Sequence, residues 1–518
     1  MSQPLLDKVY LDDVLVNFSV YGRYHAVTAV WITLAMIYSG IIFNNHVFVT
    51  EAVQYRCVDN HDARNNGSAL FKVSNAHDAL SWCTNPELCT QWVYDNPNSF
   101  AAEFQLACQD WKRTLVGSAH NFGYMVGLLI VGPLSDKLGR KPLIIIIGLI
   151  GAACGLAKSF VNFYWFYVLL EFLEAAIGDP SSPLYMLSIE LVATKSRVKY
   201  TTACKIGLSI GGIIFPLMYW LISYWRTFLK TLYAPPLLFI CAIYYLDESP
   251  RWLLSKGNTE AAVKIIDNAS KMNKIEIKEN LAMLSYEEDA SLDFKTVLVA
   301  TLKSRTLLKT FFACVTWWIT STFVSHGLSI NSVFLKGNKF INYALASVVE
   351  IPGNIFAAYL MDKFNRKLPL IFSFVACAVL CAVQPFIPND LLWLTISIYM
   401  VGKLVSTTFF TITYIFTSEL FPTYTRNSMH ALCSSVGRIG GLAAPQTPLL
   451  RVYWSGLSTV LFSVVSLIAG LVTILVPDTG DKSLPDTVLQ AEALSYTKTD
   501  VQLEENRAGI ARKNCNEA

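Results

Sequence analysis

The stretch Gly132–Pro142, GPLSDKLGRKP, places a compact group of charges between two long apolar segments. The segment before it ends in YMVGLLIV and the one after it begins LIIIIGLIGAACGLA, and each is close to the roughly 20 apolar residues that cross a bilayer core. Charges between two such segments predict a short turn in water. Gly139 suits a tight reversal, because glycine adopts backbone angles that other residues avoid.

Two motifs recur along the chain at nearly one period. DKFNRK, beginning at Asp362, repeats the Asp, Arg and Lys spacing of DKLGRK, which begins at Asp136, at an offset of 226 residues (362 minus 136). ELVATKSR and ELFPTYTR each hold a Glu followed seven residues later by Arg, at an offset of 229 (419 minus 190). Motifs that repeat in the same order predict two halves built to one plan.

The composition indicates a membrane protein. Of 518 residues, 53% are hydrophobic and only 15% are charged, and the charges gather between apolar segments. The net charge of +3 and the absence of a basic, aromatic-rich tract argue against nucleic-acid binding. The glycine-rich segments GGIIFPL and SVGRIGGLAAP lie in apolar helices and lack the Lys-Ser or Lys-Thr of a phosphate-binding loop. We therefore expect no enzyme activity, no cofactor and no metal site.

The positions of the basic residues predict the topology. Lys and Arg crowd the even-numbered loops, which places both termini in the cytoplasm. The expected fold is an all-α membrane protein with about twelve transmembrane helices in two pseudo-symmetric six-helix halves. The expected parts are a cytoplasmic N-terminus (1–25), a first half (26–246), a cytoplasmic helical linker (247–306), a second half (307–476) and a cytoplasmic tail (477–518). Two of the expected spans are continuous helices over about 160–183 and 428–450.

A long polar loop, 46–112, is expected outside the cell. It holds Cys57, Cys83, Cys89 and Cys108, which predict two disulfides with three possible pairings. Asn66-Gly67-Ser68 is a glycosylation sequon in the same loop.

These motifs together resemble the major facilitator superfamily. The four-cysteine outer loop, ESPRWLLSKG after the sixth helix and SELFPTYTRN before the eleventh resemble its organic cation, organic anion and carnitine transporter family. The resemblance covers nearly the whole chain and implies a plasma-membrane transporter of small organic ions that works by alternating access. Asn365 stands where the family has glycine in the second turn; because Asn tolerates positive φ, we expect the turn to keep its geometry.

The repeated charges are candidates for a gate at the cytoplasmic ends of the helices. Partly buried ion pairs hold well only while their geometry is complete, so sliding helices can exchange one arrangement for another. The alternative is that these residues only fix the topology and solvate the loops. The candidate gating residues are Asp136, Gly139, Arg140, Glu190 and Arg197 in the first half, and Asp362, Arg366, Glu419 and Arg426 in the second.

Ionisable residues at membrane depth are the candidates for substrate binding, because such groups are costly there. Arg438 occupies a helix 11 position where the cation-transporting branch of the resembled family has aspartate and the anion and carnitine branches have arginine. Glu350, followed by Pro352, resembles helix 8 of the cation and carnitine branches. The combination favours a zwitterion, with its carboxylate near Arg438 and its ammonium near Glu350. Lys205, on the helix equivalent to that of Arg438, is a second basic candidate.

Several alternatives remain open at this stage. Glu350 and Arg438 can instead neutralise each other; Tyr38 can hold a cation or only pack; His326 can carry a proton or only a hydrogen bond. We expect Glu171, Glu174 and Asp179 to pair with Lys205 or Lys403. Organic anion exchange and organic cation facilitation are the alternative substrate classes, and a channel or a non-transporting receptor or scaffold is the alternative of another kind. A coupling ion, whether Na+, H+ or a counter-anion, is left open.

Overall fold

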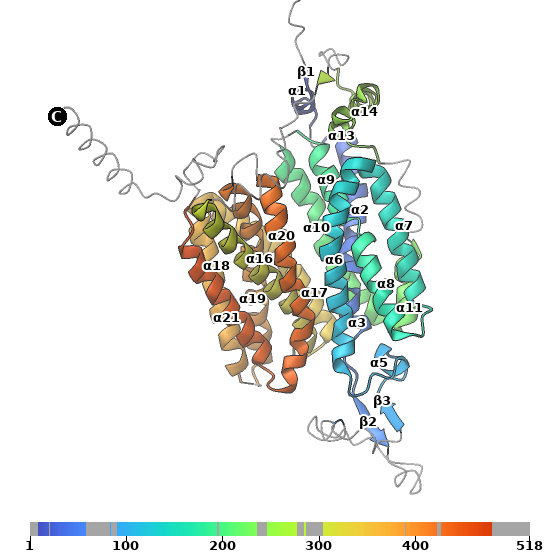
Figure 1. Ribbon diagram of the computed structural model, residues 1–518, viewed down its shortest axis with the longest axis vertical. Helices are drawn as coiled ribbons and strands as arrows, with labels where there is room; N and C mark the ends of the chain where they lie inside the picture. Colours follow the sequence, from blue (N-terminus) through green and yellow to red (C-terminus); the bar gives the residue numbers. More distant parts are fainter. Residues whose placement is uncertain are drawn as a thin grey trace, which may run out of the picture. The chain divides into compact units, whose positions relative to one another are not determined.

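The computed structural model describes residues 9–19, 21–58, 83, 91–193, 196–235, 246–276, 284–285, 304–388, 390–421 and 426–478. Within these residues the chain is almost entirely helical (Figure 1). Two small sheets complete it: β1 (Val9–Tyr10) pairs in parallel with β4 (Leu284–Ser285), and β2 (Tyr55–Val58) pairs antiparallel with β3 (Gln91–Tyr94). The chain divides into two compact units.

Unit 1 comprises Met1–Glu287, Ser332–Val348 and Pro445–Val452. Its long helices are α2 (Arg23–Phe43), α6 (Asp110–Leu138), α7 (Arg140–Lys158), α8 (Tyr164–Ile177), α9 (Ser181–Glu190), α10 (Arg197–Ile222) and α11 (Trp225–Tyr233). Shorter helices are α1 (Leu11–Val16), α3 (Asn45–Val49), α5 (Phe100–Glu103) and α13 (Pro250–Ser255), and the linker also forms α14 (Thr259–Asn273).

Unit 2 comprises Glu288–Asn331, Val349–Ala444 and Tyr453–Ala518. Its helices are α16 (Arg305–Asn331), most of α17 (Lys339–Phe364), α18 (Lys367–Val383), α19 (Leu392–Leu420), α20 (Arg426–Ala443) and α21 (Leu457–Ile474). The 3-10 segments η6 (Ser332–Phe334), η7 (Gln384–Phe386) and η8 (Ala444–Val452) link them. The first ten residues of α17 and most of η8 cluster with unit 1 rather than with unit 2.

The two units repeat one packing scheme. In unit 1, α2 packs along α10 and α7 packs on α11; in unit 2, α16 packs along α20 and α18 on α21. A Cβ on Gly211 of α10 would meet the carbonyl oxygen of Ile37, and a Cβ on Gly440 of α20 would meet that of Ile319. These glycines lie 229 residues apart (440 minus 211), the offset of the sequence repeat. Small residues at matched positions therefore bring equivalent helices into close contact.

The helices have the composition of membrane spans. Within the described residues, eight helices are long and apolar enough to cross a membrane. Large apolar side chains lie exposed along α18 and α21, including Phe372, Val379 and Leu471. Such exposure is costly in water and favourable against lipid, so these faces are suited to a bilayer.

One predicted span is broken. The expected helix over 160–183 is two helices, α8 and α9, separated at Gly178–Pro180. Pro180 has no N–H to continue the helix ladder. Asp179 instead accepts hydrogen bonds from the backbone N–H (3.0 Å) and the hydroxyl (2.7 Å) of Ser181, the first residue of α9.

Two other boundaries differ from the expectation. The charged stretch after Gly132 is helical, because α6 continues through Pro133 to Leu138, and the reversal is confined to Gly139, with φ of +98°. The expected helix over 428–450 ends as an α-helix at Ala443 and continues as the 3-10 segment η8. Pro445 and Pro448 lack the N–H groups that an α-helix would use there.

Candidate functional site

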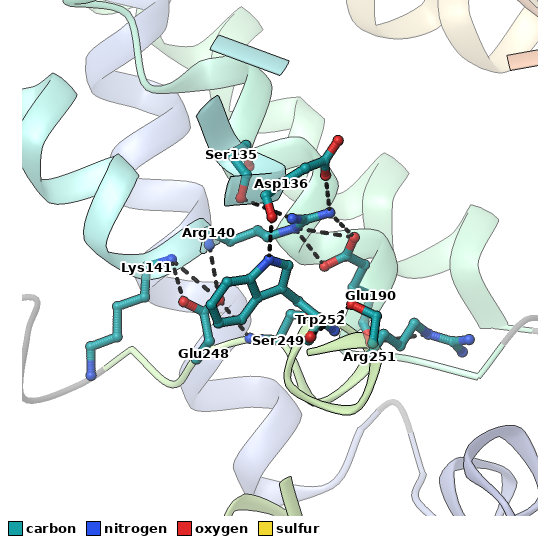
Figure 2. Close-up of polar contacts among 10 residues, drawn as sticks. Ser135, Asp136, Arg140, Lys141, Glu190, Glu248, Ser249, Arg251 and Trp252 are labelled. Atoms are coloured by element: carbon teal, nitrogen blue, oxygen red, sulfur yellow. Dashed lines mark hydrogen bonds and ion pairs between the residues drawn. The ribbon is translucent and has the colours of Figure 1, made fainter. Parts of the chain in front are cut away.

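The first candidate site is the Arg140 cluster of unit 1, formed by Asp136, Arg140, Glu190, Glu248 and Trp252 (Figure 2). The guanidinium of Arg140 makes a bidentate pair with Glu190, with Nη2 2.8 Å from Oε1 and Nε 3.0 Å from Oε2. Nη2 also lies 2.9 Å from Asp136 Oδ1. Bidentate pairs of this kind fix orientation as well as distance. The buried Arg140 thereby joins the α6–α7 turn to the end of α9.

Glu248 completes the start of α7. Its carboxylate accepts hydrogen bonds from the backbone N–H groups of Arg140 (3.0 Å), Lys141 (3.2 Å) and Ser249 (2.8 Å). The first N–H groups of a helix have no partners within it, so this carboxylate satisfies two of them. Burial raises the pKa of Glu248 above its ordinary value, and these backbone hydrogen bonds oppose the shift.

Side chains of the linker also stabilise the Arg140 cluster; we call the contacts of α13 with it the brace. Trp252 of α13 donates its indole N–H to the carbonyl oxygen of Asp136 (2.9 Å). Its neighbour Arg251 pairs with Asp12 of α1 (2.5 Å) and donates to the carbonyl oxygen of Glu190 (3.3 Å). The sequence analysis assigned no role to these side chains, although ESPRW had been singled out as a motif.

Unit 2 holds a corresponding Arg366 cluster, formed by Arg366, Lys367, Glu419 and Asp478. Arg366 pairs with Glu419 through Nε (3.0 Å to Oε2) and Nη2 (3.2 Å to Oε1). Asp478 accepts a longer hydrogen bond, 3.4 Å, from the backbone N–H of Lys367. Asn365 has φ of +63°, so it adopts the positive φ expected of asparagine in this turn, although the angle differs from the +98° of Gly139.

The pairing of these residues is therefore visible within each unit. Arg140 meets Glu190, and Arg366 meets Glu419, at matched positions of the repeat. Among the described ion pairs none involves Asp362, whose side chain is exposed. The side chains of Arg197 and Arg426 lie outside the part of the chain that the structure describes. A gating role for these residues stays a prediction.

The candidate substrate residues of unit 2 lie near the middle of its helices. Glu350 on α17 pairs with Lys403 on α19 at 2.9 Å. Lys403 also donates to the carbonyl oxygen of Ser325 (3.1 Å) and to the hydroxyl of Ser329 (2.8 Å), both on α16. Lys403 is thus the partner of Glu350, a pairing that the sequence analysis did not consider.

The remaining substrate candidates lie on separate helices. Arg438 is half-buried on α20 and His326 is half-buried on α16. Tyr38 is half-buried on α2 of unit 1. Lys205 lies on α10, and its side chain is outside the described residues.

The expected partners of Glu171 and Glu174 were wrong. Both carboxylates pair with Lys158, the last residue of α7, at 2.6 Å for Glu171. Glu171 and Glu174 are one turn apart on α8, so they share a face, and that face packs on α7. Asp179, expected to pair in the same way, accepts the hydrogen bonds from Ser181 described above. The sequence did not predict Lys158 as their partner, because this lysine ends an apolar segment, a position typical of a loop residue.

The outer loop contains a disulfide between Cys83 and Cys108. This is one of the bonds that the four cysteines allowed. Cys89 and Asn66, and the side chain of Cys57, lie outside the described residues, so the second disulfide and the glycosylation site stay predictions.

A set of contacts ties the first turns of α17 and the segment η8 to unit 1. Lys339 of α17 pairs with Glu51, which follows α3. Gln446 of η8 accepts a hydrogen bond from Thr114 (2.8 Å) and donates one to Ser118 (2.7 Å), both on α6. We call these the outer contacts.

Known proteins share this organisation. Residues 25–486 match the family described as "Sugar (and other) transporter". The chain is 31% identical to "Solute carrier family 22 member 1" of Bos taurus, over 78% of this chain and 73% of that protein. It is 30% identical to "Organic cation transporter protein" of Drosophila melanogaster, over 78% and 76%.

Solved structures agree on the fold. The inward-open xylose transporter XylE from E. coli superposes with a TM-score of 0.60 at 17% identity, covering 90% of this chain and 99% of that one. A complex of the proton:xylose symporter XylE with a bromodeoxyglucose gives a TM-score of 0.57 at 17% identity, covering 91% and 100%.

Proposed function

The chain belongs to solute carrier family 22 of the major facilitator superfamily, and from this premise we propose that it carries small organic ions bearing a carboxylate, zwitterions first. It is a transporter and not an enzyme, as its relatives are. We place it in the plasma membrane with both termini in the cytoplasm, since basic residues gather in the loops on that side.

The charge at the middle of unit 2 supports the substrate class. One carboxylate, Glu350, and two cations, Lys403 and Arg438, lie on the helices of unit 2, so these candidate residues together carry one more positive than negative charge. Lys403 lies 2.9 Å from Glu350 and offsets its charge. A guanidinium binds a carboxylate bidentately, so Arg438 is the best-suited group for a substrate anion. Glu350 keeps 32% of its side chain exposed and remains accessible to a substrate ammonium.

An organic cation is the second candidate. The observation that favours it is the similarity to "Organic cation transporter protein" of Drosophila melanogaster. In that case Glu350 and the ring of Tyr38 would hold the cation. Arg438 would then be structural.

Uptake into cells separates these two candidates. The substrates are labelled carnitine, a small organic carboxylate and tetraethylammonium, each given to cells with wild type, Arg438→Asp or Arg438→Lys at matched surface levels. We expect carnitine or carboxylate uptake in wild type, loss in Arg438→Asp, and partial retention in Arg438→Lys, which keeps the charge. Uptake of tetraethylammonium that survives Arg438→Asp would contradict the carboxylate assignment and favour the cation.

We further propose that the Arg140 and Arg366 clusters and the outer contacts open and close in turn during the transport cycle. The outer contacts join residues of α17 and η8 to unit 1, whereas the rest of α17 belongs to unit 2. Opening on the outer side must therefore break the Lys339–Glu51 pair and the hydrogen bonds of Gln446. Partly exposed pairs of this kind contribute about 1 kcal/mol or less, so breaking them costs little. In the Glu51→Gln background, labelling of Ser347→Cys on α17 by a membrane-impermeant reagent is expected to increase; unchanged labelling would contradict this role.

A further inference from the structure

A second group of charged side chains lies buried inside unit 1, where α3, α6, α7, α8 and α11 meet. Nζ of Lys158 lies 2.6 Å from Oε2 of Glu171 and also contacts Oε2 of Glu174. At most 1% of each of these three side chains is exposed. Neither the repeated motifs nor the proposed substrate site uses them.

Both carboxylates have further partners. Nδ1 of His120 on α6 lies 2.9 Å from Oε1 of Glu171. The hydroxyl of Tyr233 donates to Oε1 of Glu174, and Asn45 of α3 donates to that hydroxyl at 2.6 Å. We call these residues, with His46, the Lys158 network.

His46 completes the network. Its ring centroid lies 5.3 Å from that of His120, and only 5% of the residue is exposed. Among the described residues neither ring nitrogen of His46 has a hydrogen-bond partner. One of its nitrogens lies within 4.8 Å of ligand-type atoms of both His120 and Glu171. A buried polar group without a partner is costly, so packing alone does not explain a histidine beside His120 and Glu171.

The charge of the network indicates which ligand it takes. Glu171 and Glu174 carry two negative charges against one positive charge on Lys158. A charge left uncompensated in a buried site costs several kcal/mol. One proton makes the network neutral, whereas a divalent cation would meet the Lys158 ammonium, which lies 2.6 Å from the same carboxylate. Other titratable groups near the network are Tyr38, Cys154, Tyr167 and Asp179. The carboxyl group of Asp179 accepts two hydrogen bonds from Ser181 and is not counted in this balance.

We propose that the Lys158 network binds one exchangeable proton on the imidazole of His120, whose Nδ1 lies 2.9 Å from Glu171 and whose ring lies beside that of His46. The proton comes from water and forms an N–H bond on a ring nitrogen, and the imidazolium is stabilised by Glu171. Histidine is the side chain suited to this exchange, because it ordinarily titrates near neutral pH.

The proton site is connected to the outer contacts through α3. Asn45 and His46 of α3 belong to the network, and Phe48 of the same helix stacks on Phe340 of α17 (centroids 5.3 Å apart). A Cβ on Gly117 would meet both His46 and Pro445 of η8. Water entering between these segments would lower the cost of the unbalanced charge. Protonation is therefore expected to favour the closed outer contacts, and deprotonation to favour their opening.

Ser347→Cys supplies a reporter for opening. Ser347 of α17 is buried, and its hydroxyl lies close to Gly212 of α10. We expect labelling of this cysteine by a membrane-impermeant maleimide on intact cells to rise about threefold or more between about pH 6 and pH 8. In Ser347→Cys with His120→Gln the labelling should not vary with pH. His25→Gln is the matched control, because His25 is buried in unit 1 outside the network and bonds the carbonyl oxygen of Leu191.

The same pH dependence in the His120→Gln and His25→Gln backgrounds would overturn the proposal. His46→Gln is the second variant, because it removes no hydrogen bond made by the described residues and is therefore expected to fold. The inference rests on the proposed transport function for the meaning of outer opening. A measurement free of that premise is the unfolding midpoint of the purified full chain. Its pH dependence between about pH 6 and pH 8 should be weaker in both His variants than in wild type. If wild type shows this pH dependence and the His variants show less of it, but no tested substrate is transported, only the transport proposal is refuted and the proton site stands.

Discussion

The Arg140 cluster and the Arg366 cluster are two copies of one motif in different surroundings. In both, an arginine at the start of a helix forms an ion pair with a glutamate of a neighbouring helix. A second acidic residue accepts a hydrogen bond from the backbone N–H of the lysine that follows the arginine. The arginine side chain is 8% exposed in unit 1 and 30% exposed in unit 2. The motif therefore specifies the pair, while the surroundings decide how firmly the pair is held.

The linker accounts for much of the difference. Trp252 and Arg251 of α13 bond the backbone around the Arg140 cluster, and Glu248 accepts three N–H groups there. At the equivalent place, Asp478 accepts a hydrogen bond of 3.4 Å from the backbone N–H of Lys367. We infer that the unit 1 copy is a rigid support and that the unit 2 copy is the easier one to rearrange.

Removing the arginine of each cluster should give the largest difference in stability loss between the two copies of the motif. Arg140→Ala leaves the largely buried Glu190 without its partner, and we expect it to lower the free energy of unfolding by about 3–5 kcal/mol. Arg366→Ala removes a more exposed arginine, 30% against 8%, and a loss of about 1–3 kcal/mol is expected. Unfolding midpoints of the purified proteins check this, with the two Arg→Lys variants as controls. Equal losses would contradict the difference in support.

The turn residues give the next largest effect. Gly139 has φ of +98°, and a Cβ there would meet Glu248 and the ring of Trp252. Gly139→Ala should therefore cost at least the roughly 1–3 kcal/mol of a strained backbone. Asn365→Gly relieves a left-handed residue, and its effect should stay within about 1 kcal/mol. The same midpoint measurement checks both, and a tolerated Gly139→Ala would show that the unit 1 turn is not rigid.

The brace from α13 should have a smaller, separable effect. Trp252→Phe keeps most of the ring packing but loses the hydrogen bond to Asp136, so about 1 kcal/mol of stability should be lost. If Arg140 is rigid because of this brace, Trp252→Phe should also lower uptake. Uptake and stability both equal to wild type would show that the brace is dispensable.

Glu248 should give the smallest effect, visible as a pH dependence. Burial raises its pKa in the folded state, so the ionised form is penalised at neutral pH and the penalty disappears as the pH falls below its ordinary value. Relative to Glu248→Gln, wild type should therefore gain stability as the pH falls from about 7 to about 5. Parallel unfolding midpoints of the two proteins over this range would contradict the assignment.

The sequence predicted best where few arrangements were possible. A short charged turn between apolar helices leaves its arginine few partners, so the two motif pairs and the turn at Asn365 were foreseeable from the repeat. The repeat also predicted the matched halves. Their small-residue contacts, such as that of Gly211 with Ile37, needed the helix packing.

The ion pairs that the sequence did not predict share one physical cause, which is the packing between helices. Lys158 meets Glu171 and Glu174 only because α7 lies against α8, and no spacing in the sequence encodes that. The pairing of Glu350 with Lys403 likewise joins two helices 53 residues apart (403 minus 350). The break before α9 was readable from Gly178 and Pro180 but was hidden by the apolar run around it.

The most direct test of the central claim is a double-mutant cycle on uptake for Arg366 and Glu419, repeated for Arg140 and Glu190. Initial uptake rates are measured at matched surface levels for each Arg→Ala variant, each Glu→Ala variant and each double variant. If each pair acts as one unit, the double variant should lose little more than the worse single variant, and the losses should be larger for Arg140 and Glu190. Losses that simply multiply, or a pair whose removal leaves uptake unchanged, would contradict the account.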